Sequence, residues 1–338
     1  MSDILKPLIS RLCDAEQLSF EEMQTAFSIL MSGDATVAQI TSFMISLKMR
    51  GETSADIAAG ASQLRANAKL IEAPLNAIDI VGTGGDGAQS LNISTAAAII
   101  VAGCGVPVAK HGNKAVSSKS GAADILNELG INLECDFGLI EKAIKSANIG
   151  FLLAPKHHPT LRHVGPTRVE LGIRTIFNLL GPLSNPALVD KALIGVYDDK
   201  WGHPFAEALK LLGTKYAFVV HGEGGLDEVS LSGPTKVHAL NSGKISSFVI
   251  NPSDFGVKNQ PLESIRGGDA KYNARKLLEL LDGKISAYRD IACINAATAL
   301  VATNHEKKLN DAFKRAETSI DTGAAKNALS ELVHITNS

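Results

Sequence analysis

Cysteine is scarce in this sequence, net charge is nearly absent, and no apolar segment is long. The four cysteines show neither CxxC spacing nor histidine companions, so we expect core thiols in a reducing cytoplasm rather than disulfides or a zinc site. With a formal net charge of −2 and lysines scattered among acids, the chain offers no basic stripe to nucleic acid. The longest apolar run, 96–102, is too short to cross a bilayer. We therefore expect a soluble cytoplasmic protein with neither nucleic acid nor membrane as a partner.

The N-terminal part of the chain carries the pattern of short amphipathic helices. Ser19 and Thr36 begin capping boxes, because Glu or Gln stands three residues after each of them. Gly33 and Gly51 are placed to end the helices that follow. Apolar residues at helical spacing between positions 40 and 47 supply a stripe to bury. This pattern predicts a small all-helical domain.

From position 78 onward, apolar strands alternate with helices. Such alternation predicts an α/β fold with a mainly parallel central sheet flanked by helices, and a later hairpin is expected to turn at Gly243. The proline-rich segment 155–186, with a helix expected around 165–178, interrupts the alternation, so we expect the chain to revisit the helical domain there. The expected division is a helical domain over 1–73 with a revisiting segment at 164–186, and an α/β domain over 74–163 and 187–338.

The most informative segment is the glycine-rich turn that follows the first apolar strand. Four glycines stand within the six residues from Gly82 to Gly87, and a helix expected to begin at Asn92-Ile-Ser-Thr follows. Backbone N–H groups and hydroxyls in such a turn can cradle a phosphate. The spacing fits neither a Walker A loop nor the dinucleotide pattern. The alternative is an ordinary loop whose glycines serve only geometry, and Asp86 is either a partner for a metal ion or a turn former.

Two further strands end in polar residues. Lys110, His111 and Asn113 follow one strand, and the adjacent acids Asp227 and Glu228 follow another. In open α/β sheets ligands bind at the carboxyl ends of strands, so Lys110, His111 and Asn113 are expected to face the same crevice as the glycine loop. Adjacent carboxylates at the end of a buried strand favour a hard cation such as Mg²⁺. The alternatives are a solvated lysine, a structural histidine and a solvated acidic turn.

Arg168 stands in a helical segment that two Gly/Pro breaks interrupt. A guanidinium offers a planar fork to a carboxylate, although the same side chain can simply pair with Glu170. If the segment crosses back to the helical domain, Arg168 lies at the cleft between the domains, where ligand sites are common. Hydroxyls at 117–120 either cap the next helix or hold phosphate.

Together these segments resemble the anthranilate phosphoribosyltransferase family, whose members belong to the nucleoside phosphorylase-like phosphoribosyltransferases. The shared motifs are Gly-Thr-Gly-Gly-Asp at Gly82, Asn-Ile-Ser-Thr at Asn92, Lys-His-Gly-Asn at Lys110, the long arginine-containing run at Arg168 and Gly-Leu-Asp-Glu at Gly225. Five motifs in register cover nearly the whole chain and are hard to obtain by chance.

The resemblance implies transfer of the 5-phosphoribosyl group from phosphoribosyl pyrophosphate (PRPP) to anthranilate, the second step of tryptophan biosynthesis from chorismate. It implies PRPP binding by Gly82, Thr83, Gly84, Gly85, Asp86, Ser90, Asn92, Ser94, Thr95, Lys110 and Ser118. It implies an anthranilate path lined by Gly82, Asn113 and Arg168. Ser94, Asp227 and Glu228 would ligate two Mg²⁺ ions, no residue is assigned as acid or base, and the helical domain would form a homodimer.

Two positions depart from the family pattern, since relatives commonly carry Arg where Lys114 stands and Ser where Ala122 stands. Lysine lacks the fork of arginine, which puts the fine phosphate geometry in doubt. Two rival functions remain at this stage. A pyrimidine nucleoside phosphorylase resembles the chain less at the Lys-His-Gly-Asn tip and the acid pair, and a non-catalytic nucleic-acid-binding relative would need a basic face.

Overall fold

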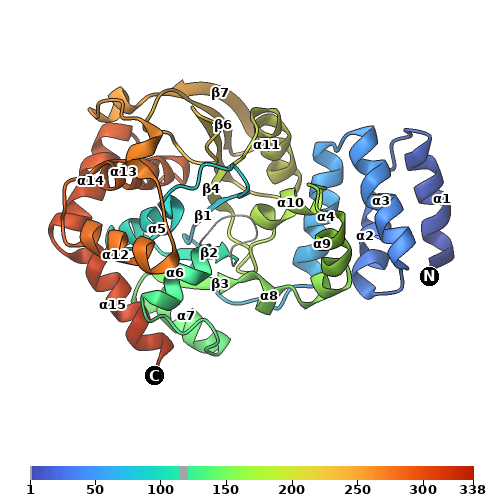
Figure 1. Cartoon of the computed structure of the whole chain (residues 1–338), viewed down its shortest axis with the longest axis horizontal. Coiled ribbons are helices and arrows are strands. Elements are labelled where there is room, and N and C mark those ends of the chain that lie inside the picture. Colours follow the sequence, from blue (N-terminus) through green and yellow to red (C-terminus); the bar gives the residue numbers. More distant parts are fainter. Residues whose placement is uncertain (1, 114–120) are drawn as a thin grey trace.

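The computed structural model describes residues 2–113 and 121–338. Figure 1 shows a helical bundle at one end of the molecule and a larger α/β body at the other. The bundle consists of α1 (Ser2–Cys13), α2 (Phe20–Ser32), α3 (Val37–Arg50) and α4 (Ser54–Ala66). This arrangement confirms the expected helical region at the N-terminus.

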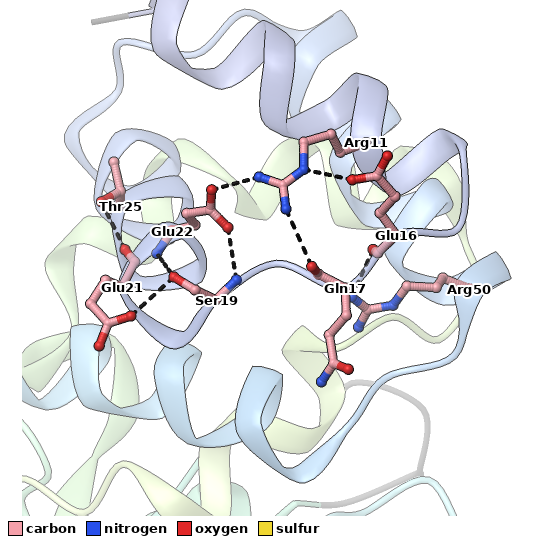
Figure 2. A network of polar contacts seen from close by, with 8 residues as sticks. All are labelled: Arg11, Glu16, Gln17, Ser19, Glu21, Glu22, Thr25 and Arg50. Carbon is pink, nitrogen blue, oxygen red and sulfur yellow. Dashed lines mark hydrogen bonds and ion pairs between the residues drawn. The ribbon is translucent and has the colours of Figure 1, made fainter.

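The helix boundaries in the bundle follow the capping signals. Ser19 and Thr36 each form a complete capping box, and Gly33 adopts a left-handed conformation (φ 88°) at the end of α2. The connection before α2 is also held by Arg11, which donates to Glu16 at 2.8 Å and to Glu22 at 2.5 Å (Figure 2). Glu22 thus serves both the capping box and this ion pair, so the α1–α2 corner is fixed by a continuous polar network.

Among the described residues, the sheets of the body contain the strands β1 (Asp79–Gly82), β2 (Val108–Gly112), β3 (Ile149–Leu153), β4 (Lys191–Gly195), β5 (Tyr216–Gly222), β6 (Thr235–Asn241) and β7 (Lys244–Ile250). One sheet has the order β1-β4-β5-β6-β7, and β2 pairs with β3 beside it. A parallel bridge between Ile78 and Val108 joins the two sheets. Pairs among β1, β4 and β5 are parallel, as is β2 with β3, whereas β6 and β7 add an antiparallel hairpin. The prediction of a mainly parallel sheet is confirmed within the described residues.

Helices cover both faces of this sheet. In chain order after the bundle they are α5 (Ile93–Gly103), α6 (Ala122–Glu128), α7 (Phe137–Ser146), α8 (Ala154–His157), α9 (Gly165–Leu171), α10 (Phe177–Leu180), α11 (Gly202–Leu211), α12 (Ala270–Leu281), α13 (Ala287–Ala302), α14 (Leu309–Asp321) and α15 (Ala324–Thr336). Apolar helix α5 lies under α13, α14 and α15 on one face, and α11 lies between the other face and α4. Figure 1 shows these two groups on opposite sides of the strands.

The prediction of a single helix around 165–178 is wrong, because this segment forms two short helices, α9 and α10. Gly172 ends α9 in a left-handed conformation (φ 61°), and the Thr175 N–H then bonds the Asn178 side chain at 3.0 Å. This break turns the chain. Helix α9 contacts α3, and α10 contacts α4, so parts of this segment lie against the bundle.

The hydrophobic core of the bundle continues into the α/β body. Phe27 and Phe43 of the bundle belong to the same buried cluster as Ile194 of β4, Phe205 of α11 and Val219 of β5. Leu193 and Val220 alternate with these strand residues and face the opposite core beneath α5 and α13. The division into two domains at residue 73 stays a prediction, and the buried apolar contacts run across it.

Candidate active site

The carboxyl ends of β1 and β5 bring the glycine loop and the acid pair together. Asp227 accepts a hydrogen bond from the backbone N–H of Gly84 at 2.6 Å. Glu228 accepts one at 3.0 Å from the N–H of Ser94, in the first turn of α5. The acid pair therefore joins the phosphate-type loop to a helix N-terminus, where backbone donors favour negative charge. The structure thus juxtaposes three segments that the sequence analysis singled out separately.

Three glycines make room for the segment that carries the two acids. A Cβ at Gly82 would overlap the Asp227 carboxylate, one at Gly195 would overlap the Asp227 backbone carbonyl, and one at Gly222 would lie 2.5 Å from the Glu228 carbonyl. Because the segment lies directly on the strand ends, side chains at these positions would displace it. The need for glycine in β4 and β5 was not anticipated from the sequence.

Changing Gly195 to Ala is expected to lower the free energy of unfolding by about 2 kcal/mol or more and to reduce activity, because the backbone of Asp227 must move. Thermal unfolding and steady-state kinetics of purified G195A measure both effects. The matched control is Gly138→Ala, since a Cβ there meets no heavy atom within 4 Å and alanine favours the surrounding helix. A G195A protein as stable and active as G138A would contradict the close approach.

The acid pair lies in an unfavourable environment for negative charge. Burial, with repulsion from Asp86 next, raises the pKa of Asp227 to about 7. Burial and the charge of Asp227 raise the pKa of Glu228 to about 8, although Lys110 acts in the opposite sense. Two adjacent carboxylates with raised pKa values lack sufficient positive charge around them, so the site favours a bound cation.

Lys110 is a buried cation near the acid pair and Asp79. Its Nζ donates to the backbone oxygen of Ile80 at 2.5 Å and to the Ser94 hydroxyl at 3.3 Å. Burial lowers its pKa, while Asp79 and the acid pair counteract that effect. The Lys110 side chain is therefore buried beside Ser94, and the alternative of a solvated lysine at the strand end is wrong.

Asp79 and Asn185 support this strand edge and were missed by the sequence analysis. The Asp79 carboxylate accepts from the backbone N–H of His111 at 3.1 Å and from the Asn185 amide at 2.7 Å. The same amide donates to the Ala109 carbonyl at 2.8 Å, so the pair ties β1 to β2 on either side of Lys110. Burial raises the pKa of Asp79 to about 6. An acid at the start of an otherwise apolar strand was the available signal.

Asn295 of α13 holds the backbone that follows the acid pair and was also missed. Its amide accepts from the Val229 N–H at 2.9 Å and donates to the Val229 carbonyl at 3.0 Å. The residue is fully buried in an apolar helix. An asparagine in the middle of such a helix is the sequence signal that points to a structural clamp.

The remaining predicted PRPP residues occupy varied surroundings. The Thr83 hydroxyl accepts a hydrogen bond from the Tyr197 N–H at 3.1 Å. The Asp86 carboxylate accepts one from the Ala88 N–H at 3.1 Å, as in a turn former. The backbone of Ser90 forms an isolated antiparallel β-bridge with that of Arg266. Asn92 accepts from the Asn273 amide at 3.0 Å. The Thr95 hydroxyl is buried and has no hydrogen-bond partner among the described residues. Lys114 and Ser118 lie outside the described residues.

Arg168 is half-buried in α9 and does not pair with Glu170. Its guanidinium lies over the Phe177 ring at 5.5 Å, and among the described residues no acid forms an ion pair with it. Burial lowers its pKa. A desolvated guanidinium without a counter-charge is suited to an anionic ligand. Asn113, which is also predicted for the anthranilate path together with Gly82, is exposed just beyond the end of β2.

Three buried histidines, His111 of β2 and His157 and His158 at the end of α8, lie near one another. The His111 and His158 rings are 5.2 Å apart, and His111 bonds the Gly181 carbonyl through Nδ1 at 3.1 Å. Burial, followed by the neighbouring imidazoles, lowers the pKa of His111 to about 3, and burial with His157 lowers that of His158 to about 4. These rings are therefore neutral at pH 7 and do not compensate the acid pair.

The side chains of the described residues alone do not form a complete metal-binding shell. Within residues 2–113 and 121–338, no group of three carboxylate, imidazole or thiol side chains is arranged to hold a metal. Asp227, Glu228 and the Ser94 hydroxyl offer the hard oxygen ligands that Mg²⁺ prefers, and Mg²⁺ commonly completes its shell with substrate phosphates and water. In the same described ranges, no helix is both long and apolar enough for a membrane span.

Comparison with known proteins gives one consistent result. Residues 6–68 match a family model described as glycosyl transferase family, helical bundle domain, and residues 75–326 match the a/b domain model of that family. The chain is 49% identical over 330 residues to an anthranilate phosphoribosyltransferase of Xanthobacter autotrophicus, covering 98% of this chain and 96% of the relative. It is 51% identical over 337 residues to that of Rhizobium meliloti, covering 100% and 99%.

Solved structures agree over the full length. Anthranilate phosphoribosyltransferase from Thermus thermophilus has a TM-score of 0.93 at 37% identity, covering 98% of this chain and 99% of that one. The Saccharomyces cerevisiae enzyme in complex with PRPP and Mg has a TM-score of 0.91 at 31% identity, covering 100% and 99%. The complex of the yeast enzyme with 4-fluoroanthranilate has a TM-score of 0.90 at 30% identity, covering 100% and 99%.

Proposed function

This chain belongs to the anthranilate phosphoribosyltransferase family, and we infer that it transfers the 5-phosphoribosyl group from PRPP to the amine of anthranilate, releasing pyrophosphate. The observation that carries this inference is the acid pair bonded to both the glycine loop and the start of α5. Full-length similarity to curated transferases supports this reading and not the pyrimidine nucleoside phosphorylase or the nucleic-acid-binding relative.

The donor site is assigned to the region where the carboxyl ends of β1 and β2 lie beside the N-terminus of α5. Glycine-loop N–H groups, the Ser94 hydroxyl and the Lys110 ammonium converge there, which suits the phosphate groups of PRPP. The residues proposed to contact PRPP are Gly82, Thr83, Gly84, Gly85, Asp86, Ser90, Asn92, Ser94, Thr95, Lys110 and Ser118.

Magnesium fits the donor set at the acid pair. A yeast relative has been solved with PRPP and Mg bound. The raised pKa values of Asp227 and Glu228 reflect burial first and repulsion between neighbouring acids second, and a bound cation would offset both effects. We assign Asp227, Glu228 and Ser94 to two Mg²⁺ ions. Bound Mg²⁺ would neutralise charge on the pyrophosphate leaving group.

The chemistry requires positioning and charge stabilisation more than a strong base. Displacing pyrophosphate from the anomeric carbon places positive charge on the ribose and negative charge on the leaving group. The amine of anthranilate is neutral and nucleophilic at physiological pH, so no side chain has to remove a proton before attack. Lys110 and the glycine-loop amides hold the donor, and Arg168 holds the acceptor carboxylate near the reacting carbon.

The acceptor path is assigned to the junction of β2 with the α9–α10 segment. Arg168 supplies a guanidinium that no acid in the described ranges neutralises, Asn113 stands just past the end of β2, and Gly82 ends β1. A carboxylate fork at Arg168 would orient the amine of anthranilate toward the donor.

We also assign a homodimer contact to the outer face of the bundle. Met49 of α3 is 82% exposed and Val169 of α9 is 81% exposed, and these two helices are in contact. Exposed apolar side chains on adjacent helices suit a self-complementary surface. Sedimentation equilibrium would give twice the chain mass if this face pairs, and the mass of one chain would rule it out.

The direct test of function is the loss of anthranilate fluorescence after mixing the protein with anthranilate and PRPP. Loss that requires Mg²⁺ is expected, because donor, acceptor and cation all enter the proposed reaction. Parallel reactions with inorganic phosphate and a pyrimidine nucleoside test the rival activity. An unchanged signal with Mg²⁺ present, together with phosphorolysis, would replace the transferase assignment.

A further inference from the structure

Arg174 reaches from the segment beside the bundle to the glycine loop. It follows the break at Gly172, and its guanidinium donates a hydrogen bond to the backbone carbonyl of Gly85. The same guanidinium lies over the Tyr197 ring at 4.1 Å. A stacked and hydrogen-bonded arginine is held more firmly than an exposed side chain with one contact.

Tyr197, on whose ring Arg174 stacks, is itself hydrogen-bonded to the glycine loop. The Tyr197 N–H donates to the Thr83 hydroxyl at 3.1 Å, and the Thr83 N–H donates to the Gly195 carbonyl at 2.9 Å. The Tyr197 hydroxyl accepts from the indole N–H of Trp201 at 3.0 Å. Arg174 therefore stacks on a residue whose backbone and ring are both fixed.

The glycine loop depends on side chains for its shape. In the described part of the chain, residues 84–88 take part in no backbone–backbone hydrogen bond. Gly84 and Gly85 both have positive φ angles, 68° and 76°, and such a run of glycines has high conformational freedom. The Asp227 carboxylate holds the Gly84 N–H, and Arg174 holds the Gly85 carbonyl. The Asp227 and Arg174 side chains come from different parts of the fold and bind two neighbouring residues of the loop.

We propose that Arg174 is a positioning residue that fixes the glycine loop in the conformation that receives the phosphate groups of PRPP. The proposal rests on the function proposed above. In a planar trans peptide the carbonyl and the following N–H point in opposite directions, so pinning the Gly85 carbonyl also fixes the direction of the Asp86 N–H. Backbone N–H groups fixed before binding hold an anion better than mobile ones do.

The role of Arg174 differs from that of Arg168, although the two residues are close in the sequence. Arg168 lies over Phe177 and is assigned to the acceptor, whereas Arg174 contacts the donor loop. Loss of Arg174 should therefore weaken PRPP binding and leave anthranilate binding nearly unchanged. A residue that only stabilises the fold would affect both substrates and the thermal stability.

The test compares Arg174→Gln and Arg174→Lys with the matched control Arg275→Gln. Arg275 is also exposed and lies over a tyrosine ring, Tyr272 at 5.4 Å, but it contacts Glu279 instead of a loop. Calorimetry with PRPP and Mg²⁺ gives the dissociation constant, and steady-state kinetics give KM for each substrate and kcat. In R174Q we expect the dissociation constant and KM for PRPP to rise about tenfold, with kcat reduced less. R174K should fall between R174Q and wild type, and R275Q should match wild type.

The outcomes separate this proposal from the function itself. Wild-type protein that does not bind PRPP would reject both. Wild-type protein that binds PRPP, together with R174Q whose PRPP affinity stays within about twofold of it, would reject the role of Arg174 alone. Equal losses for both substrates together with a lower melting temperature would assign Arg174 to fold stability and likewise overturn the proposal.

Discussion

Replacing Asp227 by Asn is expected to reduce kcat/KM for PRPP by about 10³-fold or more, which corresponds to about 4 kcal/mol of transition-state stabilisation. The reason is charge. Burial, followed by the negative charge of Asp86, disfavours the ionised form of Asp227. We therefore attribute the acid at this position to binding of a cation, which an uncharged amide would hold poorly. Steady-state kinetics over a range of Mg²⁺ concentrations measure the effect.

The same substitution should leave the metal-free fold intact or stabilise it. Removing one of two adjacent buried charges relieves repulsion, so the melting temperature of metal-free D227N should equal or exceed that of wild type. The matched control is Glu223→Gln, an exposed acid on the same turn, which should keep both activity and stability. Wild-type turnover by D227N at limiting Mg²⁺ would show that Asp227 is not a metal ligand.

Changing Arg168 to Gln should raise KM for anthranilate by about 100-fold, because a bidentate charged contact with a carboxylate contributes about 2 to 3 kcal/mol. Binding of PRPP, measured by calorimetry, should change little. Aniline has no carboxylate, so the wild-type protein and R168Q should use it equally poorly. That comparison separates loss of the clamp from general damage to the site.

Arg162→Gln provides the control for this experiment. Arg162 is exposed on the same segment, and its Nε contacts the neighbouring His163 ring at 3.3 Å. It should retain the wild-type KM for both substrates. If R168Q binds anthranilate normally, the half-buried guanidinium serves packing against Phe177 and the acceptor site lies elsewhere.

Much of this fold follows from local patterns in the sequence. The capping boxes at Ser19 and Thr36 mark helix starts, because their side chains satisfy N–H groups that a helix leaves free. The hairpin expected at Gly243 is present between β6 and β7. Lys110, His111 and Asn113 were predicted to face the glycine loop, since strand ends on one edge of a parallel sheet converge. These inferences need only local geometry and sheet topology.

What the sequence did not reveal depends on contacts between distant segments. Three side chains, those of Asn185, Asn295 and Arg174, donate hydrogen bonds to backbone carbonyls that lie far from them in the chain. Every residue has a backbone carbonyl, so the sequence does not indicate which carbonyl such a side chain contacts. The break between α9 and α10 was missed because the apolar spacing on both sides is helical, while Gly172 in a left-handed conformation ends the first helix.

The continuous core beneath the bundle has a consequence for folding and motion. Phe27, Ile194 and Val219 belong to one buried cluster that spans the bundle and the sheet. A rigid-body rotation of the bundle away from the sheet would separate these apolar side chains and expose them to water. We therefore expect the bundle to act as a fixed wall, with substrate-induced rearrangement confined to the loops at the strand ends. By the same reasoning the bundle and the sheet should melt together, as one cooperative unit.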